Sequence, residues 1–237
     1  YNMVVPSYII KRPEQIYIQT KHWASITLKR FYLDASTIQD VSANVDNWKY
    51  NGEIMDYIIT GSDFDTESSR RGFGFKKEVL QIGSPRSDAL FRGESYRKKI
   101  YNMYHMDEEY RTLIYAPTYR FDKSSTDHRH ELRAVELDFD GVRKALEKRF
   151  GGSWYIMLRL HPSVAKESNK FQKAGFIVDA SDYVDGEELV AASDIMISDY
   201  SSIMFEPSFV KKPVFLFATD KETYIDKEYD LLIDYKT

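Results

Sequence analysis

Short apolar runs alternate along the chain with longer segments in which apolar residues recur at helical spacing. The short runs are rich in β-branched and aromatic residues, a composition that is typical of strands. Strands and helical segments follow one another in turn, most clearly in the second half, and this order predicts an α/β fold with a parallel, doubly wound sheet. The predicted strands are 15–20, 54–59, 79–82, 111–115, 154–160, 176–178, 195–197 and 214–217.

Helices are predicted between these strands. Polar residues that favour helix N-caps precede several of the helical segments, and Gly151 follows one of them, where a helix commonly ends. The charged stretch 121–136 is predicted to be mainly a loop. The predicted helices are a start at 24–31, one capped by Ser62 or Asp63, a basic one near 95–106, one opened by Asp138 or Asp140, and one opened by Asp185.

The composition becomes polar and basic between Gly83 and Asp107, which suggests a domain junction. We therefore expect an N-terminal domain at 1–95 and a C-terminal domain at 96–237. Only about three strands precede the junction, fewer than a doubly wound domain usually holds. The sequence also stops directly after a strand-like segment, DLLIDY. We expect the N-terminal domain to be partial and the sequence to be a piece of a longer protein.

Charge and composition narrow the class of protein. The net charge is −4, so no bulk electrostatic attraction to nucleic acid is expected. The absence of cysteine excludes disulfides and thiolate metal sites, and is consistent with a reducing cytosol. The start of the sequence lacks a signal-peptide pattern. No apolar run reaches the roughly 20 residues that span a bilayer, so any membrane contact is expected to be peripheral.

The segment from Ser193 to Phe217 carries the strongest local signal. Its apolar strand runs into Ser198, Asp199, Tyr200, Ser201 and Ser202, after which a helical pattern begins at once. Hydroxyl groups and unpaired backbone N–H groups at a helix N-terminus favour an anion, and a phosphorylated ligand is the natural candidate. The alternative is that Asp199 or Ser201 only caps the helix.

Polar groups follow three further strands of the second half. Arg120 follows one strand, Arg159 and His161 follow the next, and residues 185–187 follow a third. The carboxyl ends of parallel strands meet at one edge of a sheet, where open α/β folds bind ligands. Arginine offers a fork of donors for phosphate, and histidine can donate a hydrogen bond or change charge near neutral pH. Surface salt bridges for the arginines and a partly buried ring for His161 are the alternatives.

His22 is the notable polar residue of the first half. It follows the predicted strand at 15–20, so it too lies at the carboxyl end of a strand. Such a histidine could act as a general base on an acceptor hydroxyl. A structural histidine packed beside Trp23 is the alternative.

Other motifs are weaker candidates. Two D-x-D patterns, at 63–65 and 138–140, have the spacing used by metal-dependent sugar-nucleotide transferases, but both precede helices and are better explained by capping. The stretch 128–131 (HRHE) lacks the spacing of a zinc motif and is interpreted as a solvated loop. Neither a P-loop nor a G-x-G-x-x-G pattern is present. We expect neither a metal nor a cofactor.

Five segments, taken in order, resemble the CDP-glycerol glycerophosphotransferase family, the teichoic-acid primases and polymerases of bacterial cell-wall synthesis. They are YIQTKHWASITLKRF, IGSPRSDALF, LIYAPTYR, LRLHP and DIMISDYSSIMFEPSFVKKPVFLF. The resemblance implies a GT-B architecture, in which two Rossmann-like domains face each other across a cleft. It also implies transfer of glycerol phosphate from CDP-glycerol to a hydroxyl of a lipid-linked acceptor, with release of CMP.

The resemblance also implies roles for single residues. His22 matches the family's catalytic base. The matching donor-phosphate ligands are Arg120, Arg159, His161, Ser201 and Ser202, and the surrounding Ser198 and Asp199 belong to the same motif. The family's lipid-linked acceptors imply a cytoplasmic enzyme working peripherally at the inner face of the bacterial membrane.

This chain departs from the family pattern in places. Lys21-His22-Trp23 stands where the family usually has Trp-His-Gly, and Glu206 stands where it has aspartate. Glu206 is expected either to contact a ribose or to face solvent. These changes suggest a divergent subfamily, so ribitol or another polyol is an alternative to glycerol. A nucleotide-sugar glycosyltransferase of the same fold and a non-catalytic binding module are the remaining alternatives.

Overall fold

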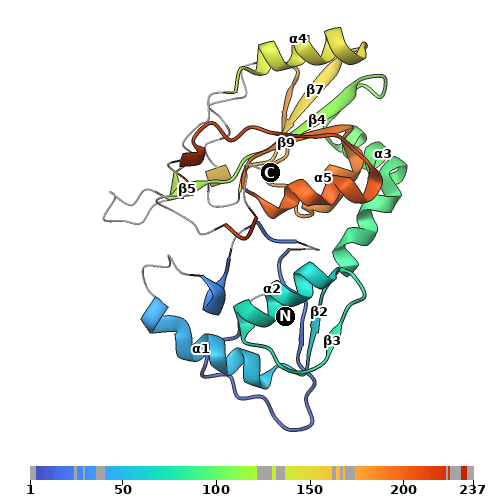
Figure 1. Cartoon of the computed structure of the whole chain (residues 1–237). Coiled ribbons are helices and arrows are strands. Elements are labelled where there is room, and N and C mark those ends of the chain that lie inside the picture. The colour runs from blue at the N-terminus through green and yellow to red at the C-terminus, as the bar shows by residue number, and fades with distance from the viewer. Residues whose placement is uncertain are drawn as a thin grey trace. The chain divides into compact units, whose positions relative to one another are not determined.

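The computed structural model describes residues 4–23, 26–28, 30–35, 41–121, 130–131, 137–161, 164–165, 168, 174–222, 224 and 231–233. The chain forms two compact units (Figure 1). The N-terminal unit comprises residues 1–87 with 220–237, and the C-terminal unit comprises residues 88–219. The predicted boundary between functional domains at residue 95 stays a prediction.

The C-terminal unit is built on a five-stranded sheet in which every strand pair is parallel. The strand order is β10-β9-β4-β7-β8, so the chain winds outward from β4 in one direction and then in the other. This is the order of a doubly wound nucleotide-binding sheet, and the expected fold class is confirmed. The strands are β4 (Arg111–Ala116), β7 (Trp154–Leu158), β8 (Ile177–Asp179), β9 (Ile195–Ser198) and β10 (Val214–Leu216). The α-helices are α3 (Gly93–Met103), α4 (Phe139–Phe150) and α5 (Gly186–Ala192).

Successive residues of β4 pack on opposite faces of this sheet, as the period of two in a strand requires. Leu113 belongs to a buried cluster with Leu146 of α4. Ile114 belongs to a second buried cluster, with Ile100 of α3 and Leu189 of α5. Helices therefore cover both faces, with α4 on one side and α3 and α5 on the other (Figure 1). A sheet buried on both faces explains the continuous apolar sequence of its central strands.

Side chains at the helix starts fix where the helices begin. Asp138 accepts a hydrogen bond from the Gly141 backbone N–H at 2.9 Å and caps α4. Asp185 accepts from the backbone N–H groups of Glu187 and Glu188 and caps α5. Both helix starts are as predicted. The helix predicted after β9 is a 3-10 helix, η4 (Ser202–Val210). Pro207 lies inside it and lacks the N–H that an α-helical hydrogen bond would need.

The N-terminal unit contains a smaller parallel sheet, in the order β1-β2-β3. Trp23, Ile58 and Phe73 belong to its buried core. The three strands confirm the predicted strand positions, although each is shorter than expected. The elements are β1 (Ile18–Gln19), η1 (Tyr32–Asp34), α1 (Val41–Ile54), β2 (Tyr57–Ile59), α2 (Asp63–Phe73) and β3 (Val79–Leu80), and the 3-10 helix η2 (Pro85–Arg92) spans the division between the units.

One prediction for the N-terminal unit is wrong, and one helix was missed. The described residues of 24–31 are not helical; the Leu28 carbonyl instead accepts a hydrogen bond from the Leu232 N–H at 2.8 Å, a distant partner that a helix would not allow. Helix α1 was not predicted at all. Its sequence has weak helix propensity, and tertiary contacts stabilise it: Asn51 accepts from the Val5 N–H and donates to the Val5 carbonyl.

The predicted loop at 121–136 is also partly wrong. It contributes to a short antiparallel pair, β5 (Arg120–Phe121) with β6 (His130–Glu131). Residues 122–129 and 132–136 lie outside the described part of the chain, so the first half of the HRHE stretch does as well.

Candidate functional site

The candidate site lies at the carboxyl edge of the C-terminal sheet. Strands β9 and β4 are neighbours there, and they are also the point at which the winding direction of the chain reverses. Open α/β sheets bind ligands at such a switch point because the loops that leave the two strands run to opposite faces. The predicted site residues of the C-terminal unit follow β4, β7 and β9 in sequence, so the topology brings these three strand ends to one edge.

The last residue of β9 and the residue that follows it are hydrogen-bonded to the end of β4 and the residues just after it. The Ser198 hydroxyl donates to the Ala116 carbonyl at 2.7 Å, and its side chain is fully buried. The Asp199 carboxylate accepts from the Thr118 N–H at 2.8 Å and from the Tyr200 N–H at 2.6 Å. These contacts place Ser198 and Asp199 beneath the edge, where they fix the path of the turn.

Arg120 is buried against the same turn. Its guanidinium lies 2.9 Å from Oδ2 of Asp199, and both side chains are almost fully buried. It also donates to the Thr118 carbonyl at 2.6 Å and lies over the ring of Tyr200. The surface salt bridge that was the alternative for Arg120 is therefore wrong. Direct contact between Arg120 and a donor phosphate stays a prediction.

Ser201 and Ser202 are the residues of this turn that reach the surface. Ser201 is the N-cap of η4 and accepts from the Ile203 N–H at 3.4 Å. Both serines are half-buried. Glu206 lies further along η4 and is only 3% exposed, so the alternative that it simply faces solvent is wrong.

Arg159 and His161 follow β7. The Arg159 guanidinium is half-buried and donates to the Ser181 carbonyl. Burial lowers the pKa of Arg159, while the nearby Glu187 acts in the opposite direction, and the group stays charged at neutral pH. His161 is exposed, and its ring centroid lies 4.5 Å from that of Tyr119, which follows β4. The partly buried ring that was the alternative for His161 is wrong.

His22 lies in the N-terminal unit, three residues after β1 ends. It is exposed, and its ring meets the edge of the Trp23 indole at a centroid distance of 4.8 Å. Its backbone carbonyl accepts from a guanidinium N–H of Arg86 at 2.5 Å. His22 therefore packs beside Trp23, as expected for a structural histidine, and its ring is also exposed, as a catalytic base needs.

Sequence reasoning missed the residues that surround His22. Lys21 and Asp65 form an ion pair whose side chains are 1% and 0% exposed. The only sequence signal for it was the D-x-D pattern at 63–65, which was assigned to capping. Ser62 is the N-cap of α2, as predicted, whereas Asp65 is buried in the ion pair. Neither aspartate of the second D-x-D pattern joins such a pair: Asp138 caps α4 and Asp140 is exposed.

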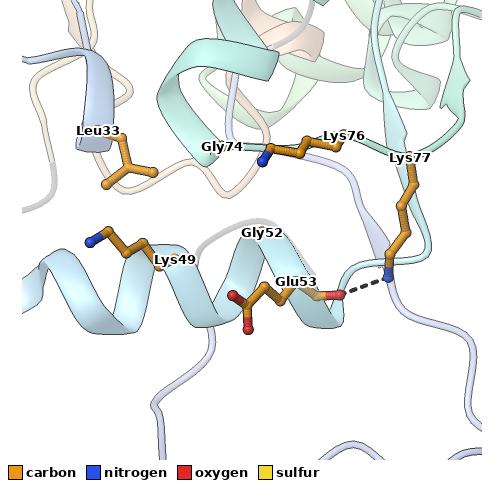
Figure 2. A pocket seen from close by; sticks show the side chains of 7 residues that line it. All are labelled: Leu33, Lys49, Gly52, Glu53, Gly74, Lys76 and Lys77. Carbon is orange, nitrogen blue, oxygen red and sulfur yellow. Dashed lines mark hydrogen bonds between the residues drawn. The ribbon is translucent and has the colours of Figure 1, made fainter.

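Figure 2 shows a groove in the N-terminal unit, with a volume of about 500 Å³. It lies at the amino end of β3, the edge opposite to the one at which ligands bind in such sheets. The Lys77 ammonium donates to the Glu53 and Met55 carbonyls, at 2.7 Å each, and so supplies hydrogen bonds to backbone carbonyls at the C-terminal end of α1. None of the predicted site residues lines this groove; those that do are Leu33, Lys49, Gly52, Glu53, Gly74, Lys76 and Lys77.

The described part of the chain holds neither a cluster of metal ligands nor a membrane-spanning helix. Among the described residues, no three histidine, aspartate or glutamate side chains gather in a way that could hold a metal ion. Over the same part of the chain, no helix combines the length and the apolar character needed to cross a membrane.

Comparison with known proteins gives the family. The chain matches the CDP-Glycerol:Poly(glycerophosphate) glycerophosphotransferase family over residues 1–237. The chain belongs to this family. It is 31% identical over 241 residues to the teichoic acid poly(glycerol phosphate) polymerase of Bacillus subtilis (strain 168), with 99% of this chain and 31% of that protein covered. The chain therefore spans about a third of the length of that relative.

Two further proteins extend the comparison. The teichoic acid ribitol-phosphate primase of Bacillus spizizenii (strain ATCC 23059 / NRRL B-14472 / W23) is 28% identical, with 98% of this chain and 59% of that protein covered. The solved structure of the wall teichoic acid polymerase TagF is 30% identical with a TM-score of 0.83, covering 100% of this chain and 58% of TagF. A histidine-to-asparagine variant of TagF soaked with CDPG matches with a TM-score of 0.80. The likeness to TagF confirms the expected fold class.

Proposed function

We propose that this chain is part of a glycerophosphotransferase that moves glycerol phosphate from CDP-glycerol to a hydroxyl of a lipid-linked, teichoic-acid or capsule-type acceptor and releases CMP. The match to the family over the whole chain carries this proposal. The TagF variant soaked with CDPG supports the choice of donor. The switch point in the C-terminal unit, with exposed or half-buried donor groups after β7 and β9, supplies chemistry suited to a diphosphate.

The reaction needs one nucleophilic displacement at phosphorus. The acceptor oxygen attacks the phosphorus that bears glycerol, and a new phosphate ester bond forms. The bond from that phosphorus to the oxygen bridging to CMP breaks, and CMP leaves in line with the attack. The proton of the acceptor hydroxyl passes to the imidazole of His22, which acts as general base. Negative charge develops on phosphoryl oxygens, so positioned hydrogen-bond donors supply most of the catalysis.

The residues of the C-terminal unit divide into two groups under this proposal. Arg159, His161, Ser201 and Ser202 reach the surface and bind the donor phosphates. Beneath them, Ser198, Asp199 and Arg120 hold the turn that presents the serines, through the contacts to Ala116 and Thr118. Glu206 is proposed to contact the donor ribose from its buried position in η4.

The acceptor and the place of work are part of the proposal. A lipid-linked acceptor would bring the enzyme to the inner face of the bacterial membrane as a peripheral protein. The acidic net charge of −4 gives no support for nucleic acid as a partner.

CDP-ribitol is the second candidate donor. The likeness to the ribitol-phosphate primase of B. spizizenii favours it, because that relative also aligns over nearly the whole chain. The nucleoside diphosphate is common to both donors, so the same phosphate-binding groups would serve either polyol.

Donor choice tests the proposal. CMP or UDP release is measured for the full-length protein with CDP-glycerol, CDP-ribitol and a UDP-sugar, each with a lipid-linked acceptor analogue. Rapid CMP release with CDP-glycerol is expected, and release with CDP-ribitol at a higher kcat/KM would select the second candidate. Turnover of the UDP-sugar alone, or no release from any donor by the folded protein, would overturn the proposal in favour of a glycosyltransferase or a binding module.

A further inference from the structure

The chain around His22 has an unusual backbone. Lys21 has a φ of +61°, in the left-handed region that side chains other than glycine rarely adopt. A lysine persists in this conformation only where its surroundings hold it there. Trp23 has no positive φ, so its large side chain is compatible with its backbone conformation. The left-handed residue of this segment is Lys21, directly before His22.

Asp65 holds the residues on both sides of His22. Its carboxylate oxygens lie 2.6 and 2.5 Å from the Lys21 ammonium, and one of them accepts from the Trp23 indole N–H at 3.4 Å. The carboxylate also accepts from the Gly61 N–H at 2.9 Å and from the Ser69 hydroxyl at 3.4 Å. Asp65 belongs to helix α2, so these bonds connect the His22 segment to a regular element of the core.

Other contacts hold the same segment. The Lys21 backbone N–H donates to the side-chain carbonyl of Gln19 at 2.9 Å, and Gln19 is itself fully buried. Trp23 is 4% exposed and packs against Phe73. Lys21 and Trp23 are therefore buried while His22, between them, is exposed. The arrangement presents the imidazole at the surface and leaves its two neighbours little freedom to move.

Stability alone does not account for a charged pair at this position. Removing two ions from water is unfavourable, and replacing a buried ion pair by apolar residues is often neutral or stabilising. Burial lowers the pKa of Lys21, which shows that the ammonium loses hydration, although Asp65 acts in the opposite direction. One partner of this pair, Lys21, precedes the exposed His22, and the other, Asp65, contacts Trp23, which follows it. The pair is therefore better explained by a role in positioning His22 than by a contribution to folding energy.

We propose that Asp65, through Lys21 and Trp23, is a positioning residue that fixes the backbone and the imidazole direction of His22. This inference rests on the proposed function, because it assigns His22 the role of general base. A base must lie within hydrogen-bond reach of the proton that it accepts, so a small displacement of the His22 backbone slows proton transfer and leaves donor binding unchanged.

The test uses the full-length protein and a double variant, Lys21→Met with Asp65→Leu, which removes both buried charges together and avoids an unpaired ion. We expect kcat for CMP release from CDP-glycerol to fall at least about tenfold while the KM for the donor stays within about twofold. The acidic limb of the kcat–pH profile, which reports the base in the complex, should shift in the same variant. Lys21→Arg keeps the ion pair and should retain most of the activity.

Two further variants keep the inference falsifiable. Trp23→Phe preserves an aromatic ring but removes the N–H donor to Asp65, and should lower kcat about threefold, in line with the loss of one weak hydrogen bond. The matched control is Lys11→Met with Asp56→Asn, which removes another ion pair of the same unit, at 2.7 Å, and should leave kcat unchanged. The inference is overturned if the double variant folds and keeps the kcat and the pH profile of the wild type. Should the double variant not fold, a wild-type kcat and pH profile for Trp23→Phe overturns it instead.

His22→Ala separates the two possible failures. If it abolishes CMP release while the double variant retains full kcat, the positioning inference fails and the proposed function stands. If His22→Ala releases CMP at the wild-type rate, the base assignment itself fails, whatever the double variant does.

Discussion

The Thr118 backbone N–H donates a hydrogen bond of 2.8 Å to Oδ1 of Asp199, and so joins the residues that follow the neighbouring strands β4 and β9. These strands form the switch point of the sheet, where the proposed donor site lies. The same carboxylate faces the buried guanidinium of Arg120 at 2.9 Å. Asp199 thus links the backbone of the proposed donor site to the buried guanidinium of Arg120.

The Asp199–Arg120 pair predicts a large effect on stability. Asp199→Asn keeps an acceptor for Thr118 but removes the negative charge beside Arg120. An uncompensated buried charge is costly, so the free energy of unfolding should fall by about 3 kcal/mol or more. Urea unfolding measures this. The control is Asp140→Asn, at an exposed residue 3.9 Å from Arg143, which should change stability by less than about 0.5 kcal/mol. Equal effects of the two variants would contradict the structural role of the pair.

Ser202 gives a prediction for donor binding. Ser202→Ala removes a half-buried hydroxyl at the start of η4, and the dissociation constant of CDP-glycerol should rise roughly tenfold if that hydroxyl bonds a charged phosphate. Isothermal titration calorimetry measures the change. Ser208→Ala is the matched control, because this exposed serine of the same helix donates to the Phe205 carbonyl. A rise in both variants, or in neither, would argue against a phosphate contact at Ser202.

Gly52 predicts a packing requirement between helices α1 and α2. A Cβ atom at this position would lie 2.2 Å from the Phe73 carbonyl oxygen, which is backbone and cannot turn away. Gly52→Ala should therefore destabilise the protein by roughly 1–3 kcal/mol. Gly175→Ala, where a Cβ would meet no atom within 4 Å, is the control and should have little effect. Thermal unfolding of the two variants gives the comparison, and equal stability would show that the helices do not approach this closely.

The environment of Asp56 predicts part of the loss of folding stability in acid. The Lys11 ammonium, and then the Tyr17 backbone N–H, hold the pKa of the Asp56 carboxyl below its ordinary value. A carboxyl with a lowered pKa in the folded state contributes stability above its unfolded pKa, and this contribution is lost as the pH falls through the folded pKa. Asp56→Asn should lower stability at pH 7 and flatten its decline below about pH 4.

The control for this prediction is Glu78→Gln, at an exposed residue of the same unit. Urea unfolding between pH 2.5 and pH 7 should show an unchanged decline for the control. If Asp56→Asn and the wild type lose stability in parallel as the pH falls, Asp56 has no part in the acid response.

The sheet of the C-terminal unit was predictable because its signals are local. Its strands are apolar runs, and the caps Asp138 and Asp185 precede helical patterns directly. The order of strands then placed Arg159 and His161 at one edge with the turn after β9. The form of that turn was not predictable: the helix after it is 3-10, and a single Pro207 in an apolar segment does not decide between a kinked α-helix and a 3-10 helix.

The parts that sequence reasoning missed depend on distant contacts. Helix α1 is held by Asn51, whose partner Val5 lies 46 residues away. The ion pair of Lys21 with Asp65 joins residues 44 apart, and neither residue type signals burial in a sequence. The guanidinium of Arg120 was expected to bind a ligand. No local sequence pattern indicated that it would instead form a buried ion pair with Asp199.

The most direct test of the account is CMP release from CDP-glycerol by the full-length protein carrying His22→Ala, with a lipid-linked acceptor analogue. Loss of a general base predicts a fall in kcat of at least about a hundredfold, with the dissociation constant of the donor unchanged. The control is His105→Asn, at another exposed histidine, whose left-handed φ of +53° asparagine tolerates. Wild-type turnover by His22→Ala, or an equal loss in both variants, would contradict the account.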